Sequence, residues 1–271
     1  MISAHNIAFS FGEHKILESV GFSAEDGEVT GIIGKNGSGK STLLKVLAGL
    51  KPPVEGDVLY NGLAIPAFSP IELAEHRAFL QQRNNLNLAM TVEDIVALGN
   101  IRGTSLPKKE LFQDFEISQF RHRSFYTLSG GEQQKVLMAM VSYQLELSTV
   151  NQKFLFLDEP LNNLDAINQK ELMIRIRKMT SQGIGIIIVL HDLDKALQLC
   201  DRIAVLSHGK IVEQGDPKVV LTEEFVHDQF GIKTQRLIEE NGVHRLIEVS
   251  SALSQGREEN SPMSCSKLDH N

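Results

Sequence analysis

The segment GKNGSGKS, residues 34–41, follows the apolar run EVTGII and fits the pattern G-x-x-x-x-G-K-[ST]. Glycines allow backbone N–H groups to turn inward around phosphates, and a helix that begins near Lys40 adds its positive end. We predict that Lys40 reaches the β- and γ-phosphates of a nucleotide and that the Ser41 hydroxyl ligates Mg²⁺. The alternative is a glycine-rich turn without a ligand, and the complete pattern between a strand and a helix argues against it. The predicted nucleotide-binding residues of this segment are Gly34, Lys35, Asn36, Gly37, Ser38, Gly39, Lys40, Ser41 and Thr42.

A second group of reactive residues closes the apolar run FLFLDEP, residues 154–160. A buried strand that ends in Asp158 places a carboxylate at the edge of a sheet, where it can hold Mg²⁺, usually through water. Glu159 follows at once and would face an attacking water as a general base. In isolation, such a pair is often a solvated turn or a helix cap. Downstream of a phosphate loop, we interpret it as one carboxylate for the metal and one for the water.

Hydrophobic periodicity indicates which elements position these residues. Two short, almost wholly apolar runs, 154–160 and 183–192, flank the amphipathic stretch 167–182. This pattern is typical of βαβ units in a parallel sheet that is covered on both faces. Further strands are predicted at 2–11, 15–24 and 28–33, helices at 41–50 and 130–147, helical patches within 91–125, and hairpins at 202–215 and 234–249, the last turning at Asn241-Gly242.

Composition and charge limit the classes of partner. The 271 residues carry a formal net charge of −7, so a broad basic face for nucleic acid is unexpected and no nucleic-acid partner is predicted. Cys200 and Cys265 lie far apart and indicate no disulfide or metal framework. The N-terminus lacks a basic start followed by an apolar run, and no stretch approaches the roughly 20 apolar residues that span a bilayer. We expect a cytoplasmic chain that relies on another protein wherever it serves a membrane.

The pentapeptide LSGGE, residues 128–132, separates the classes of phosphate-loop protein. With it, residues from about 2 to 250 resemble the ATP-binding subunits of ABC transporters, because the order of phosphate loop, glutamine, LSGGE, LFLDEP, NNLD and VLH agrees throughout. The resemblance implies an α/β fold with a phosphate-loop NTPase core, a mostly parallel sheet, an N-terminal antiparallel β subdomain and a small α-helical insertion at about 91–127. It also implies an ATPase that converts ATP to ADP and phosphate. The polar stretch 251–271 is predicted to be a disordered tail.

In that family, two copies of the domain hold ATP between them in a head-to-tail homodimer. Each site combines the phosphate loop of one copy with the LSGGE of the other. Ser129, Gly130 and Gly131 precede a predicted helix and would present N–H groups and a positive helix end to the γ-phosphate. Such a dipole contributes only about 0.3–1 kcal/mol at an exposed site, so closure requires several contacts together. The resemblance adds Glu132 to this surface and assigns Asp165 to the loop that crosses to the opposite site.

Three further positions match functional residues of the family. Gln82 matches the glutamine that touches Mg²⁺ and the attacking water, and the adjacent Gln81 is the alternative. His191 matches the histidine that reaches the γ-phosphate. Phe11 aligns with the aromatic residue that stacks on adenine, although tyrosine is commoner there and Phe9 or Phe11 could be a core residue of the strand. The resemblance thus implies catalytic roles for Glu159, His191, Gln82 and Lys40, and Mg²⁺ ligation by Ser41, Gln82 and Asp158.

Three features depart from the family pattern without removing a catalytic group. Leu161, Asn162 and Asn163 stand where threonine, serine and alanine are frequent. The stretch between LSGGE and LFLDEP is longer than usual, and LELSTVNQK reads as a small insertion. The segment from Gln82 to Leu128 is short for the family, which leaves the size of the helical insertion and its contact with a membrane subunit open.

Two regions give a hint of the transported cargo. TVEDIVALG and GDPKVVLTEEFVHDQFGI resemble importers of iron–siderophore complexes, haem or cobalamin. We predict that the chain powers uptake of an iron–siderophore or related metal chelate through separate integral membrane permease subunits. A substrate-binding protein is predicted as an indirect partner, and the chain is expected as a peripheral subunit at the cytoplasmic face of the cell membrane.

Other functions remain open at this stage. They are import of zinc or manganese, transport of another cargo, a soluble ABC ATPase of translation or DNA repair, and a regulator that binds ATP without turnover. The single phosphate loop and the lack of a heptad run argue against the soluble ATPase. The presence of both Glu159 and His191 argues against the regulator.

Overall fold

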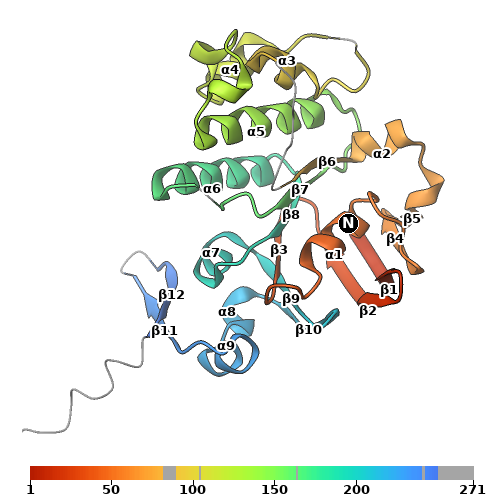
Figure 1. Ribbon diagram of the computed structural model, residues 1–271, viewed down its shortest axis with the longest axis vertical. Coiled ribbons are helices and arrows are strands. Elements are labelled where there is room, and N and C mark those ends of the chain that lie inside the picture. Colours follow the sequence, from red (N-terminus) through yellow and green to blue (C-terminus); the bar gives the residue numbers. More distant parts are fainter. Residues whose placement is uncertain (82–89, 104, 163, 240–241, 250–271) are drawn as a thin grey trace, which may run out of the picture.

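The computed structural model describes residues 1–81, 90–103, 105–162, 164–239 and 242–249 (Figure 1). Several sequence predictions lie outside these residues, namely the glutamine Gln82, the turn residue Asn241 and the tail 251–271. Asn163, one of the departures from the family pattern, also lies outside them. Among the described residues, none of the helices combines the length and the apolar character that a membrane span requires.

An antiparallel sheet forms the N-terminal layer, at the right of Figure 1, with the strand order β2-β1-β4-β5. Its strands are β1 (Ile2–Phe11), β2 (His14–Ala24), β4 (Glu55–Tyr60) and β5 (Leu63–Ala64). Along β2, buried Leu17, Val20 and Phe22 are separated by residues that are exposed or half-buried, as in a sheet with one solvated face. The predicted N-terminal antiparallel β subdomain is confirmed.

A six-stranded sheet with the order β10-β9-β3-β8-β7-β6 occupies the centre of the molecule. Its strands are β3 (Val29–Ile33), β6 (Arg77–Leu80), β7 (Phe154–Asp158), β8 (Gly185–Val189), β9 (Arg202–Ser207) and β10 (Lys210–Gly215). All neighbours pair in parallel except β9 and β10, which form the predicted hairpin. The predicted α/β fold with a mostly parallel sheet is confirmed, and β6 is a strand that the sequence analysis missed.

Consecutive residues of the central strands alternate between two hydrophobic cores. On β7, Leu155 and Leu157 belong to one core, whereas Phe154 and Phe156 belong to the other. Every residue of β7 is buried because both faces of the sheet are covered, which explains the continuous apolar run in the sequence. The helices that cover the sheet are α1 (Lys40–Leu47), α5 (Gly130–Leu147), α6 (Ala166–Ser181) and α7 (Leu193–Leu199).

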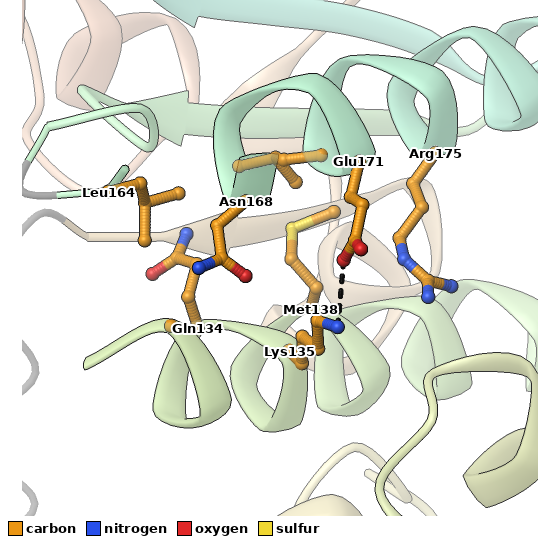
Figure 2. A pocket seen from close by; sticks show the side chains of 9 residues that line it. Gln134, Lys135, Met138, Leu164, Asn168, Glu171 and Arg175 are labelled. Atoms are coloured by element: carbon orange, nitrogen blue, oxygen red, sulfur yellow. Dashed lines mark ion pairs between the residues drawn. The ribbon is translucent and has the colours of Figure 1, made fainter. Parts of the chain in front are cut away.

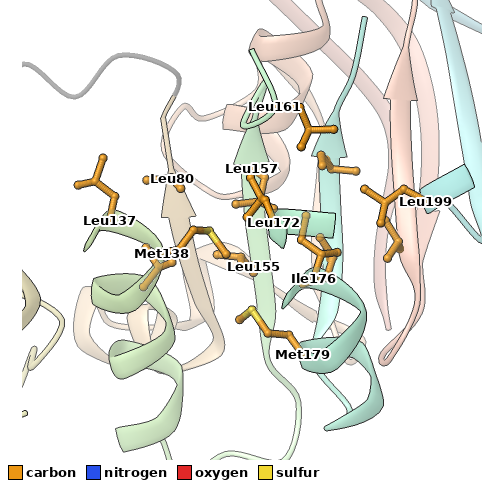
Figure 3. Packing of buried hydrophobic residues seen from close by; sticks show 14 of the residues in the cluster. Leu80, Leu137, Met138, Leu155, Leu157, Leu161, Leu172, Ile176, Met179 and Leu199 are labelled. Atoms are coloured by element: carbon orange, nitrogen blue, oxygen red, sulfur yellow. The ribbon is translucent and has the colours of Figure 1, made fainter. Parts of the chain in front are cut away.

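One of these cores fixes α5 and α6 relative to the sheet. Figure 3 shows Met138 of α5 and Leu172 and Ile176 of α6 converging on Leu155 and Leu157 of β7. All five side chains are at most 5% exposed. Residues in the middle of α5 and α6 are therefore packed against the same strand that ends in Asp158, so a shared core fixes both helices relative to that strand.

Short elements complete the molecule. Two helices lie within the predicted helical insertion, and both match the patches identified there, TVEDIVALGN and KKELFQDF. The short elements are α2 (Pro70–His76), α3 (Val92–Ala97), α4 (Lys109–Asp114), α8 (Pro217–Val220), α9 (Glu223–Phe230), β11 (Thr234–Ile238) and β12 (His244–Glu248), with the 3₁₀ turns η1 (Ile65–Ala67), η2 (Ser118–Phe120) and η3 (Phe125–Thr127). β11 and β12 pair antiparallel and form the second predicted hairpin.

Candidate functional site

The phosphate loop lies between β3 and α1, as its pattern predicted. Lys40, the first residue of α1, is buried, and its ammonium donates hydrogen bonds to the carbonyl oxygens of Gly34 (2.9 Å) and Lys35 (3.0 Å). Burial lowers the pKa of Lys40, while the carboxylates of Glu159 and Asp158 act in the opposite direction. The loop therefore closes around one buried cation whose charge faces two carboxylates.

The backbone of the loop offers donors to an anion. A Cβ atom at Gly34 (φ +153°) would stand 2.1 Å from the carbonyl oxygen of Leu206 on β9, so only glycine fits there. Gly37 (φ +78°) and Gly39 (φ +105°) adopt left-handed conformations that favour glycine. Gly39 is also the N-cap of α1 and makes no side-chain cap. The first N–H groups of the helix are therefore open to phosphate oxygens.

Ser41 and Asp158, which come from two separate motifs, meet in the structure. The Ser41 hydroxyl donates a hydrogen bond of 2.8 Å to Oδ1 of Asp158, the last residue of β7. Burial raises the pKa of Asp158, and the Ser41 hydrogen bond and the charge of Lys45 oppose this effect. Nearby, the buried Oγ of Ser38 has no hydrogen-bond partner among the described residues. Hydroxyl and carboxylate oxygens are the ligands that Mg²⁺ takes, so this donor set fits the ion.

Glu159 stands directly after Asp158 with a positive φ of 53°, which is uncommon for a residue that carries a side chain. Its side chain is 11% exposed. Oε1 contacts Nε2 of His191, and Oε2 accepts a hydrogen bond of 2.6 Å from Nδ2 of Asn162. An adjoining cavity of about 180 Å³ is lined by Glu159, Asn162, Gln169, His191 and Lys195 together with four other residues. The arrangement presents an oriented carboxylate to a polar cavity large enough for water.

The LSGGE residues begin α5. Ser129 is the N-cap: its Oγ accepts a hydrogen bond from the N–H of Glu132 (3.4 Å), and its own N–H donates to Oε2 of Glu132 (2.7 Å). The Ser129 N–H and the Ser129 hydroxyl, which donates to the same Oε2 at 2.8 Å, lower the pKa of Glu132. Both Ser129 and Gly130 are exposed. The start of this helix therefore faces solvent, although its capping box satisfies part of its backbone.

Asn168 of α6 connects this helix start with Asp165. Its N–H and its Nδ2 donate hydrogen bonds of 2.8 and 2.9 Å to the two carboxylate oxygens of Asp165, the N-cap of α6, and both lower the pKa of Asp165. A Cβ atom at Gly131 would stand 2.9 Å from the same Asn168 side chain. Figure 2 shows Asn168 facing Gln134 of α5, in the pocket between α5 and α6 that a Lys135–Glu171 ion pair of 2.7 Å also lines. The sequence analysis missed Asn168, because its role comes from packing between two helices.

Burial separates the two candidate aromatic residues at the end of β1. Phe9 is 7% exposed and belongs to the core, whereas Phe11 is 51% exposed. Their rings meet edge to face with centroids 5.0 Å apart. Nζ of Lys51 lies 4.4 Å from the centroid of the Phe11 ring, within the range of a cation–π contact. Phe11 is therefore the aromatic ring that a planar ligand can reach.

The structure brings some of the predicted residues together in two groups. In the first, Ser41 is hydrogen-bonded to Asp158, and His191 contacts Glu159, the residue after Asp158. The charge of Lys40 interacts with both carboxylates. In the second, Asn168 connects Gly131 with Asp165. Asn162, noted in the sequence only as a departure from a family pattern, belongs to the first group through its hydrogen bond to Glu159.

A phosphate loop between β3 and α1, an Asp-Glu pair at the end of β7 and an LSGGE helix start define an ATP-binding cassette within the phosphate-loop NTPases. The chain belongs to the ABC transporter family, whose model matches residues 17–162. It is similar to the hemin import ATP-binding protein HmuV of Bradyrhizobium diazoefficiens, with 37% identity over 238 residues that cover 86% of this chain and 89% of the relative. The chain is therefore an ATP-hydrolysing subunit of the ABC type, as the sequence predicted.

Solved structures agree with this assignment. The ADP conformation of MJ1267, an ATP-binding cassette of an ABC transporter, superposes with a TM-score of 0.72 at 28% identity, covering 85% of this chain and 98% of the other. The dimeric structure of MJ0796, a bacterial ABC transporter cassette, gives a TM-score of 0.70 at 25% identity, covering 80% and 99%. ABC ATPases of this kind work as dimers with membrane permease partners.

Proposed function

We propose that two copies of this chain bind ATP between them and, by hydrolysing it, power an importer of an iron chelate. One observation supports the hydrolytic part most directly: the oriented carboxylate of Glu159 directly follows Asp158, whose Oδ1 lies 2.8 Å from the Ser41 hydroxyl. Lys40 and the N–H groups of the phosphate loop bind the phosphates. Glu159 accepts a proton from the attacking water at a carboxylate oxygen, and His191 reaches the γ-phosphate.

Mg²⁺ is the proposed cofactor, with Ser41, Asp158 and Gln82 as its ligands. When bound, Mg²⁺ would neutralise negative charge on the phosphates. The raised pKa of Asp158 fits this role, because a buried carboxylate beside a cation regains its preference for the charged form. The adenine ring stacks on the exposed face of Phe11, a contact worth about 1–3 kcal/mol by analogy with nucleic-acid bases on aromatic side chains.

A second copy of the chain is proposed to complete each site. The helix start at Ser129, Gly130 and Gly131, together with Glu132, meets the γ-phosphate held by the phosphate loop of the other copy, and Asp165 belongs to the loop that crosses to the same site. The exposure of Ser129 and Gly130 supports this role, since an anion can reach the helix start without rearrangement of the fold. The remaining nucleotide contacts are proposed for Gly34, Lys35, Asn36, Gly37, Ser38, Gly39 and Thr42.

Haem is the cargo that the relative supports, because HmuV is named for hemin import and aligns along 86% of this chain. An iron–siderophore complex is the second candidate, from the regional resemblance of the sequence. In either case, the chain would act as a peripheral subunit on separate permease subunits at the cytoplasmic face of the cell membrane. A substrate-binding protein would deliver the chelate to the permease.

Growth on defined iron sources tests the cargo. A strain of the source organism that lacks this gene should fail to grow with hemin as the sole iron source and should grow normally with ferric citrate. The parent gene should restore growth, and a Glu159→Gln gene should not. Loss of growth on a ferric siderophore with normal growth on hemin would identify the siderophore complex, rather than haem, as the cargo. Normal growth on both would reject iron-chelate import.

A further inference from the structure

The C-terminal hairpin, formed by β11 and β12, is hydrogen-bonded to the side chain of Asp194 in the first turn of α7. Nε of Arg245 on β12 lies 3.1 Å from each carboxylate oxygen of Asp194, and Nη2 lies 3.0 Å from Oδ2. The N–H of Leu246 donates a further hydrogen bond of 2.9 Å to Oδ1 of Asp194. Gln198, one turn further along α7, donates to Oδ2 at 2.7 Å. Such a bidentate contact fixes direction as well as distance.

The hairpin is itself anchored on its far side. Arg236 on β11 donates hydrogen bonds of 2.6 Å to the carbonyl oxygens of Lys218 and Leu221, in and just after α8. The N–H of Arg236 donates to the carboxylate of Glu223 at the start of α9 (3.0 Å). Leu246 is 7% exposed and packs in the same core as α7. The hairpin therefore has two separate attachments, one to α8–α9 through Arg236 and one to α7 through Arg245 and Leu246.

α7 begins directly behind His191. Asp192 is the N-cap of the helix and accepts a hydrogen bond of 3.1 Å from the N–H of Lys195. On its other side, His191 is tied to the sheet through Leu190, whose N–H donates to the carbonyl oxygen of Ile32 on β3 (3.2 Å). The backbone of His191 thus connects the end of β8 to the N-cap and first turn of α7. A shift of that turn moves the ring that contacts Glu159.

We propose that Arg245 is a positioning residue for His191, acting through Asp194 and the first turn of α7. The hairpin then contributes to ATP hydrolysis, because it holds His191 in the position where the ring contacts Glu159 and where the ring can reach the γ-phosphate. This inference rests on the proposed role of His191 in hydrolysis. Since a misplacement of about 1 Å at a reacting group can cost up to about 100-fold in rate, a modest rotation of α7 suffices for a large effect.

The test compares Arg245→Ala, Arg245→Lys and His191→Ala in the full chain, with Arg236→Ala as the matched control. Arg236→Ala removes the other arginine anchor of the same hairpin but leaves the contact with α7 in place. We expect Arg245→Ala to lower kcat for ATP about tenfold, with KM unchanged because the phosphate loop is untouched. Arg245→Lys should recover part of the rate, and Arg236→Ala should lower the unfolding temperature while kcat stays at the parent value.

A spectroscopic readout separates positioning from loss of stability. With ¹³C-labelled histidine, the ring signal of His191, assigned by its absence in His191→Gln, should shift in Arg245→Ala and stay in place in Arg236→Ala. A parent kcat and an unshifted His191 signal in folded Arg245→Ala would overturn the proposal. A parent kcat in His191→Ala would instead reject the role of His191 itself, so the two failures are distinguishable.

Discussion

The phosphate loop and the LSGGE helix start, which we propose to contact phosphate, differ in how far a single chain completes them. In the first, Lys40 and Asp158 are buried. Lys40 donates hydrogen bonds of 2.9 and 3.0 Å to carbonyl oxygens of the loop, and Asp158 accepts one of 2.8 Å from Ser41. In the second, Ser129 and Gly130 are exposed, and the Ser129 cap is closed by hydrogen bonds with Glu132 of the same turn. The phosphate-loop half of the proposed site is therefore preorganised within a single chain. The other half is presented outward, where a second chain can use it.

The largest expected effect concerns the chemical step within the buried half. Glu159→Gln keeps the shape of the side chain and its contact with Asn162 but removes the proton acceptor. We expect hydrolysis to fall by about 10²–10⁴-fold, as measured by phosphate release, because that is the contribution of a general base. ATP binding, measured by calorimetry, should remain within a factor of a few. Hydrolysis at the parent rate would show that another group takes the proton.

Removal of the buried cation should weaken binding rather than chemistry alone. Lys40→Ala deletes the ammonium that the loop encloses, and a hydrogen bond to a charged group contributes about 1.5–3 kcal/mol. We expect the Kd for ATP to rise by about 10–150-fold in calorimetry. Lys170→Ala, at an exposed position of α6, is the matched control and should leave the Kd unchanged. An unaltered affinity in Lys40→Ala would contradict the preorganised half of the comparison.

A substitution at the LSGGE helix start should impair dimer formation but not the binding of ATP to a single chain. Ser129→Arg places a long cation at the exposed helix start, and we expect one chain to bind ATP with parent affinity. In the Glu159→Gln background, light scattering with ATP should show dimers for Glu159→Gln alone and monomers for the double variant. Ser181→Arg, at the exposed C-terminal end of α6, controls for an added charge. ATP-dependent dimers of the double variant would remove the LSGGE surface from the interface.

The smallest effect is on stability. Burial raises the pKa of Asp158 in the folded chain above its unfolded value, so this carboxyl makes folding less favourable as the pH rises from the unfolded pKa through the folded one. Asp158→Asn removes that cost and keeps an oxygen acceptor for Ser41. We expect the nucleotide-free protein to unfold about 2–4 °C higher at neutral pH, corresponding to about 1 kcal/mol. The gain should shrink as the pH is lowered below both pKa values.

A control at the surface sharpens this prediction. Asp57→Asn on β4 removes an exposed carboxylate and should leave the unfolding temperature within about 1 °C. If Asp158→Asn destabilised the nucleotide-free protein instead, the hydrogen bond from Ser41 and the nearby lysines would outweigh the burial of the charge. The site would then be stabilised by this hydrogen bond and by attraction to the nearby lysine charges, rather than prepared for an added cation.

The sequence by itself determined the order and type of most elements that carry the site. The apolar runs of β7 and β8, the glycines of the phosphate loop and the helix after LSGGE follow from local physics, since periodicity and backbone freedom are written in neighbouring residues. The motifs also indicated the reaction, because Lys40, Asp158 and Glu159 stand at fixed offsets within two short segments. The strand β6 was missed, because a stretch of only four residues between a helix and a loop carries little periodicity.

Only the tertiary structure decided which of these residues touch. It separated Phe11 from Phe9 by exposure, brought Ser41 to Asp158 across 117 positions of sequence, and placed Asn162 on the carboxylate of Glu159. The contact of Arg245 with Asp194 likewise joins segments 51 positions apart. Such contacts depend on how helices and strands pack around two shared cores. The spacing of residues along the chain does not show which distant side chains this packing brings together.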